Sequence, residues 1–142
     1  GLGVPVIGSE QYPQGLGATV GSLADALGSG FLVKLTFSCD RDEGLRAAVE
    51  RTGRAQIVVT GIEAHVCVLQ TAVDLLAEGY EVYVPHDAVS SRRGADKDWA
   101  LHRMAAAGAV ITSTESVLFE LLERCDTADF KTVAKLIKKI PV

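Results

Sequence analysis

The feature that most constrains the fold is the passage from residue 55 to residue 78, where a β-branched run leads into a long helical pattern. Residues 55–61 (AQIVVTG) form a run too short for a helix, which predicts a central strand of a parallel sheet near residues 56–61. Residues 64–78 follow with helical periodicity, and Gly79 supplies the expected stop. A buried strand that continues into a helix is typical of α/β folds.

The same alternation of strand and helix patterns continues along the chain. It predicts an α/β fold, a three-layer, mostly parallel sheet with helices on both faces. The chain has 142 residues and no repeats or linkers, which fits a single domain over residues 1–142. We expect further strands near residues 4–9, 31–34, 80–84 and 109–112, and further helices near residues 42–52, 96–107, 115–123 and 128–139.

Composition argues against several classes of function. The net charge is −4 with both signs interspersed, so we expect no nucleic-acid partner and no membrane surface as a partner. No apolar run approaches the roughly 20 residues that a membrane span needs. Three widely spaced cysteines do not form a secreted disulfide framework, which favours a cytoplasmic location. Three scattered histidines lack metal-ligand spacing, so we expect neither a metal nor another cofactor.

Cys67 is the one residue whose position favours chemistry. It lies in the first turn or so of the helix that follows the buried strand, and ligands of α/β proteins bind at this end of the strands. The free N–H groups and partial positive charge of a helix N-terminus favour a thiolate over a thiol. From position alone, the alternative of a small buried apolar side chain is equally open. Cys39 and Cys125 lack this context and are expected to be structural.

Three ordered motifs resemble those of the isochorismatase-like cysteine hydrolases. They are residues 34–38 (KLTFS), 61–68 (GIEAHVCV) and 87–92 (DAVSSR), and residues 10–17 with 129–138 are most similar to the isochorismatase-domain branch. The resemblance covers essentially the whole chain. It implies a Rossmann-like fold, a homo-oligomer, and hydrolysis of a small-molecule substrate at an amide or related C–N bond through a thioester-type intermediate.

The resemblance also implies the residues of the site. Cys67 would be the nucleophile, and Lys34 would hold the thiolate and the substrate electrostatically, although Lys34 read alone could be a solvated surface lysine. A non-proline cis peptide is implied between Ile62 and Glu63. The backbone N–H groups of Glu63 and Cys67 would then point to one oxyanion position, with the Glu63 carboxylate at the rim.

Two departures from the family pattern argue against two of the reactions that the family catalyses. In the nicotinamidase branch an Asp-x-His metal motif follows the strand that matches residues 4–8, whereas residues 10–12 here are Glu, Gln and Tyr. No histidine precedes His65, which argues against a nicotinamidase-type metal and substrate. The true isochorismatases do not use a cysteine nucleophile, so Cys67 argues against vinyl-ether hydrolysis.

The third catalytic residue of the family, an Asp, ends an opening strand that this chain does not contain. That strand would lie at the centre of the sheet, between the strands ending at Gly8 and Gly61, where we expect a gap or a strand from elsewhere. The chain therefore reads as an N-terminally incomplete hydrolase domain. The alternative is a non-catalytic interaction or scaffold protein that keeps the fold and the oligomer surface. Three other aspartates are in the wrong context to replace this Asp, namely Asp25, Asp40 and Asp42, and Asp87 is expected to hold loop structure near the site.

Overall fold

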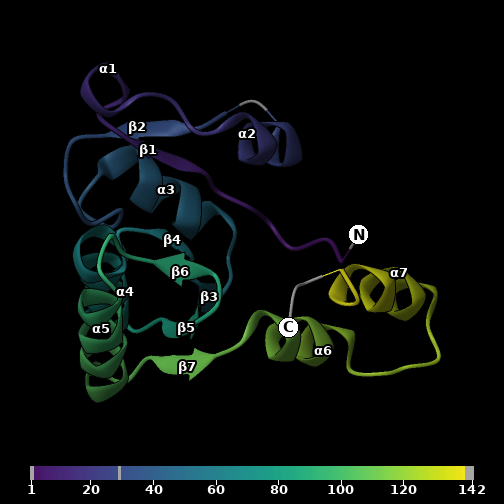
Figure 1. The fold of residues 1–142 in the computed structure, drawn as a ribbon. Helices are drawn as coiled ribbons and strands as arrows, with labels where there is room; N and C mark the ends of the chain where they lie inside the picture. The colour runs from purple at the N-terminus through teal and green to yellow at the C-terminus, as the bar shows by residue number, and fades with distance from the viewer. Residues whose placement is uncertain (1, 29, 140–142) are drawn as a thin grey trace.

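The computed structural model describes residues 2–28 and 30–139 and shows an α/β fold whose strands pair in parallel (Figure 1). The strands of these ranges form three small sheets, with the orders β1-β2, β3-β5-β7 and β4-β6. Each of the four pairings is parallel, as the alternation of strands and helices predicted. The strands are β1 (Ser9–Gln11), β2 (Leu32–Lys34), β3 (Gln56–Val58), β4 (Gly61–Ile62), β5 (Glu81–Pro85), β6 (Val89–Ser90) and β7 (Val110–Thr112).

Helices connect these strands. The helices are α1 (Pro13–Leu16), α2 (Gly21–Leu27), α3 (Glu43–Arg51), the π-helix η1 (Ala64–Val68), α4 (Leu69–Ala77), α5 (Gly94–Ala107), α6 (Thr114–Leu122) and α7 (Ala128–Ile137). In Figure 1, α4 and α5 lie together on one side of the strands, and α6 and α7 lie on the other side. The five expected helices are confirmed within a few residues, whereas α1 and α2 were missed because glycines interrupt their apolar pattern. Among the described residues, no helix is both long and apolar enough to cross a membrane.

An aliphatic core fixes η1 and α4 against β5 and α5. Along η1 and α4 the buried residues Val68, Ala72 and Leu75 recur at helical spacing, so they share one face. Burying one Val or Leu side chain contributes about 1.5–3 kcal/mol, so this core holds the turn that carries Cys67. The remaining buried members of the cluster are Ala64, Leu69, Val82, Val84, Val89, Ala100, Met104 and Ala109.

The strand expected near residues 4–9 is wrong in its position and burial. Val6 is 67% exposed and residues 4–7 lie outside the sheets, whereas β1 begins at Ser9. The pairing starts where the Leu32 N–H donates to the Gly8 carbonyl (2.9 Å). Apolar residues favour burial, but a strand also needs a neighbour for its backbone groups, and β2 supplies one only from this point.

The strand expected near residues 56–61 divides into β3 and β4. The Val59 N–H donates to the Tyr83 carbonyl (2.9 Å), which continues the pairing of β3 with β5. The Gly61 N–H then donates to the Ala88 carbonyl (3.0 Å), at the start of the pairing of β4 with β6. The backbone therefore stops pairing with β5 and starts pairing with β6 just before the turn that carries Cys67.

β1 and β3 lie in different sheets within the described ranges. Each lies at the edge of its own sheet, because neither has a neighbour on its second side there. Direct pairing between them would have contradicted the expected interruption between the strands that end near Gly8 and Gly61. Their separation agrees with that interruption.

Candidate functional site

Cys67 lies in the wide π-helical turn η1, between β4 and α4. The Glu63 carbonyl accepts hydrogen bonds from the N–H groups of Val66 (3.1 Å) and Val68 (3.3 Å), and the second of these bonds spans five residues. Such wide turns are rare in proteins, and those that do occur are often found at functional sites. The Ile62–Glu63 peptide bond at the start of the turn is cis, which is the bond for which the family resemblance implies this geometry.

Lys34 ends β2 and is a buried cation rather than a solvated surface lysine. The residue is only 3% exposed. Its Nζ donates to Oε1 of Gln11 (2.5 Å) and to the backbone carbonyls of Thr36 (3.0 Å) and Phe37 (2.8 Å). These acceptors match the three donors of an ammonium group, which offsets the cost of burying its charge. The ammonium group is thereby held in one place.

The Gln11 side chain connects Lys34 to Cys67. In the register of β1 and β2, Gln11 pairs with Lys34. Oε1 of Gln11, which accepts the Lys34 bond, also lies 3.9 Å from Sγ of Cys67 as acceptor for its thiol. Nε2 of Gln11 donates to the Leu35 carbonyl (3.0 Å) and fixes the orientation of the amide group. The structure thus places the predicted Cys67 and Lys34 at one site, on either side of an amide oxygen.

Gln11 was missed in the sequence analysis. Residues 10–17 are a short polar segment rich in Gly and Pro, and such a segment has no strand pattern. The signal that could have found Gln11 is its parallel pairing with β2, and that pairing is a property of the fold.

The segment after β6 is fastened to the turn that carries Cys67. Oε2 of Glu63 accepts a hydrogen bond from the Arg92 N–H (3.0 Å) and lies 3.6 Å from Nδ1 of His65. Nδ1 of His65 also lies 3.0 Å from Oγ of Ser91. The 61–68 and 87–92 motifs therefore form one structural unit, and the Glu63 carboxylate has a positioning contact within it.

Asp87 anchors the turn between β5 and β6 to the start of α6. Its Oδ1 accepts hydrogen bonds from the backbone N–H (2.8 Å) and the Oγ1 (3.0 Å) of Thr114. Desolvation raises the pKa of Asp87, but the hydrogen bonds from Thr114, with smaller contributions from its own backbone N–H and from His86, lower it further, and the net pKa is lowered. This contact agrees with the loop role expected for Asp87.

Two of the aspartates expected not to replace the missing Asp have surroundings that agree with this expectation. Asp42 caps α3 by accepting from the Leu45 N–H (3.0 Å). Asp40 is buried, and its pKa is raised by that burial and then by the charge of Glu78. Within residues 2–28 and 30–139, no carboxylate lies within hydrogen-bond distance of Sγ of Cys67.

The position of the nicotinamidase metal motif has a different role in this chain. Glu10 accepts a hydrogen bond from the Thr19 N–H (2.7 Å), and this bond lowers the Glu10 pKa. Glu10 therefore holds the loop between α1 and α2. In the described part of the chain, no three His, Cys, Asp or Glu side chains gather closely enough to hold a metal ion.

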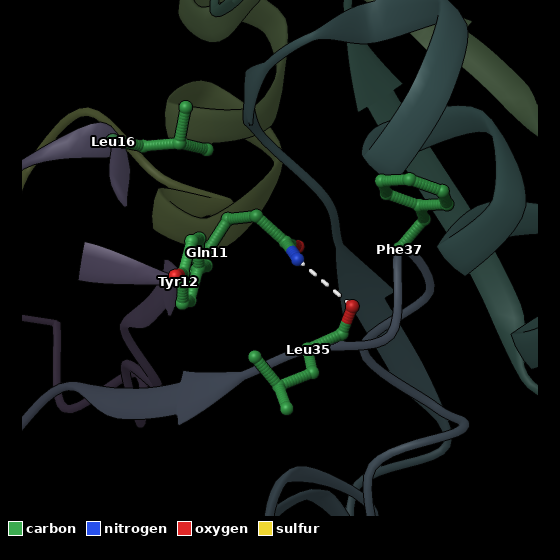
Figure 2. A pocket seen from close by; sticks show the side chains of 5 residues that line it. All are labelled: Gln11, Tyr12, Leu16, Leu35 and Phe37. Atoms are coloured by element: carbon green, nitrogen blue, oxygen red, sulfur yellow. Dashed lines mark hydrogen bonds between the residues drawn. The ribbon is translucent and has the colours of Figure 1, made fainter. Parts of the chain in front are cut away.

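A hollow of about 400 Å³ opens beside Gln11. Figure 2 shows its lining, with the Gln11 amide bonded to the Leu35 carbonyl and the Phe37 ring on the far side. The remaining lining residues are Tyr12 and Leu16. Apart from the Gln11 amide and the Tyr12 hydroxyl, the side chains around the hollow are apolar.

Comparison with known sequences identifies relatives over nearly the whole chain. The profile of the isochorismatase domain family matches residues 2–116. Isochorismatase domain-containing protein 1 of Salmo salar is 44% identical over 138 residues, which cover 96% of this chain and 48% of that protein. The chain therefore spans about half the length of this curated relative.

Solved structures share the fold over nearly the whole of this chain. A structure described as the MAR1 ribonuclease of Caenorhabditis elegans is 39% identical with a TM-score of 0.88, covering 98% of this chain and 72% of that one. YcaC from Pseudomonas aeruginosa, solved with hexane-2,5-diol and covalent acrylamide, is 27% identical with a TM-score of 0.83. That match covers 95% of this chain and 73% of the YcaC chain.

Proposed function

The chain belongs to the isochorismatase domain family, and we propose that it is a cysteine hydrolase that cleaves a small amide or related C–N bond. Cys67 would be the nucleophile and the intermediate a thioester. The observation that carries the proposal is the arrangement of Cys67, Gln11 and Lys34, in which one amide oxygen contacts both the thiol and the buried ammonium.

In the proposed reaction, the Cys67 thiolate attacks the carbonyl carbon of the substrate. A C–S bond forms, and the carbonyl electron pair moves to oxygen. The N–H groups of Glu63 and Cys67 would stabilise that oxyanion, as donors aimed at developing charge do in acyl transfer. The C–N bond then breaks as the Asp that the family resemblance implies would protonate the leaving amine, and the same Asp would activate the water that hydrolyses the thioester. The positive charge of Lys34 would favour the thiolate form before the attack.

Turnover needs a group that protonates the leaving amine and activates water. Such a positioned acid or base typically contributes 10²- to 10⁴-fold. Among the described residues, no carboxylate lies within hydrogen-bond distance of Cys67 to do this. We therefore assign attack by the thiolate to this chain, and propose that departure of the amine and hydrolysis of the thioester both depend on an Asp of the kind that the family resemblance implies. Without that Asp, Cys67 should be acylated only by a substrate whose leaving group departs without a proton, such as a nitrophenyl ester.

The Pseudomonas aeruginosa relative supports the proposal. Its structure holds covalent acrylamide, which nucleophiles attack at the alkene carbon with the amide left intact, so a protein of the same fold presents a nucleophile to a small electrophile. The ribonuclease name of the Caenorhabditis elegans relative does not favour the same activity here. The net charge of −4 provides no positive field for RNA.

A non-catalytic scaffold is the second candidate, and the lack of a neighbouring carboxylate near Cys67 in the described ranges favours it. The two candidates differ in whether an acyl group is transferred to Cys67. The test is incubation with a panel of small nitrophenyl esters, whose leaving group departs without a proton, followed by intact-protein mass spectrometry and peptide mapping. Acylation of Cys67 that is lost in Cys67→Ser and kept in Cys125→Ser supports the hydrolase. Absence of any acyl adduct on Cys67 favours the scaffold.

We also propose that the protein forms a homo-oligomer. The proposal rests on the family resemblance, and Trp99 on α5, which is 69% exposed, is a candidate contact because Trp is enriched where subunits meet. Light scattering after size-exclusion chromatography gives the mass directly. A Trp99→Ala variant should lower the oligomer mass if this part of α5 lies in the interface.

A further inference from the structure

The hollow beside Gln11 lies between three segments. These are the end of β1, the short helix α1 and the residues that follow β2. Its five lining residues include four large side chains that are mostly apolar or aromatic (Figure 2). They are Tyr12, Leu16, Leu35 and Phe37.

These four side chains are exposed rather than packed. Leu16 and Leu35 are each 73% exposed, Phe37 is 55% exposed and Tyr12 is 50% exposed. Single exposed apolar residues are ordinary, but several around one concave surface mark a binding site for an apolar group. The lining contains no charged side chain, so an ionised ligand group would lose its hydration there without gaining a partner.

The hollow is joined to Cys67 through the Gln11 amide. Nε2 of Gln11 donates to the carbonyl of Leu35, which belongs to the wall of the hollow. Oε1 of the same amide faces Lys34 and Cys67. Cys67 itself does not line the hollow, so the Gln11 amide is the one described group that contacts both, and a substituent on a substrate at Cys67 would have to pass it to enter the hollow.

We infer that this hollow binds an apolar group attached to the scissile amide, so that the substrates are neutral amides with an aromatic or branched aliphatic group. The inference rests on the proposed function of Cys67. The hollow would select by contact with the Phe37 ring and the two leucines, and it would disfavour anionic groups.

Alkylation of Cys67 tests this inference without requiring turnover. The probes are iodoacetamide, N-benzyliodoacetamide and iodoacetate. In each case the thiolate attacks the CH₂ carbon, the S–C bond forms, the C–I bond breaks and iodide leaves. Rates at Cys67 are read by peptide mass spectrometry, with glutathione as the reference thiol. We expect the ratio of the benzyl rate to the iodoacetamide rate to exceed the glutathione ratio by about fivefold or more.

Variants test whether the residues of the hollow cause the preference of Cys67 for the benzyl probe. Phe37→Ala and Leu35→Ala should each reduce the ratio toward that of glutathione, and both side chains are exposed enough to be removed without loss of the fold. The matched control is Val20→Ala, an exposed apolar side chain outside the hollow, which should keep the wild-type ratio.

Results that contradict only this inference can be distinguished from results that also contradict the proposed function. A wild-type ratio equal to that of glutathione, with Cys67 still alkylated faster than Cys125, overturns the inference and leaves the proposed function in place. A Cys67 that reacts with none of the probes overturns both. If Phe37→Ala changes the oligomer mass and leaves the ratio unchanged, the hollow is a contact between copies of the chain and the inference is wrong.

Discussion

Oε1 of Gln11 lies 3.9 Å from Sγ of Cys67 and accepts its thiol hydrogen bond. The same oxygen accepts from the buried Lys34 ammonium, so the thiol and the cation are linked through one neutral group. The charge at position 11 should therefore control the reactivity of Cys67.

Gln11→Glu places a negative charge at this point. A carboxylate beside a thiol disfavours the thiolate, so alkylation of Cys67 by iodoacetamide at neutral pH should slow by about fivefold. Gln14→Glu is the matched control, because it makes the same change at an exposed position of α1. Peptide mapping gives the rate at Cys67. An unchanged rate in Gln11→Glu would show that the amide oxygen does not influence the thiol.

The two site residues Cys67 and Lys34 could be predicted from the sequence for a simple reason. Cys67 and Lys34 each sit in a contiguous motif at the end of a strand, so their neighbourhood can be read along the chain. Gln11 contributes through pairing with a residue 23 positions away, in a strand of only three residues. Local patterns carry no information on such a pairing.

The errors in the fold have the same origin. Val6 and its apolar neighbours predicted a buried strand, but burial depends on what covers them, and here Val6 is exposed. The helical periodicity after Gly61 was correct, yet apolar spacing does not distinguish the π-helical turn around Cys67 from an α-helical one. Core positions such as Leu75 were predictable because α4 follows the ordinary helical period.

Removal of the Lys34 charge should affect both stability and reactivity. Lys34→Met leaves the carbonyls of Thr36 and Phe37 without their donor, which should lower the free energy of unfolding by about 1–3 kcal/mol. Alkylation of Cys67 should also slow, because a nearby cation favours the thiolate. Lys135→Met, at an exposed position of α7, is the control for loss of one positive charge. Urea denaturation and peptide mapping measure the two effects, and unaltered alkylation would remove Lys34 from the proposed mechanism.

The core behind the Cys67 turn should be sensitive to truncation. Leu75 is 3% exposed on α4, so Leu75→Ala should cost about 2–5 kcal/mol through lost burial and a residual cavity. Leu136→Ala on α7 removes the same atoms from a side chain that is 55% exposed and should cost much less. Equal urea midpoints for the two variants would contradict the core described here.

Asp40 should destabilise the fold at neutral pH. Its burial, followed by the charge of Glu78, raises the Asp40 pKa in the folded protein, and Arg46 offsets this only in part. The folded state therefore disfavours the ionised form, and Asp40→Asn should raise the urea midpoint at pH 7. This gain should shrink as the pH falls through the raised pKa, and it should vanish below the ordinary pKa of an aspartic acid. Asp25→Asn, on the exposed surface of α2, is the control. A gain that persists at low pH would contradict the charge effect.

The last prediction separates acylation from turnover. Lys34 and the turn around Cys67 supply what a thiolate needs to attack a carbonyl, whereas no carboxylate of the described ranges lies within hydrogen-bond distance to complete the cycle. With a nitrophenyl ester, whose leaving group departs without a proton, residues 1–142 should therefore release about one equivalent of nitrophenolate per chain and then stop, because the thioester persists. Mass spectrometry of the stalled protein should find the acyl group on Cys67, and Cys67→Ser should release none. Steady release over many equivalents would show that a group within this chain activates water. The proposal that turnover depends on a further Asp would then be wrong.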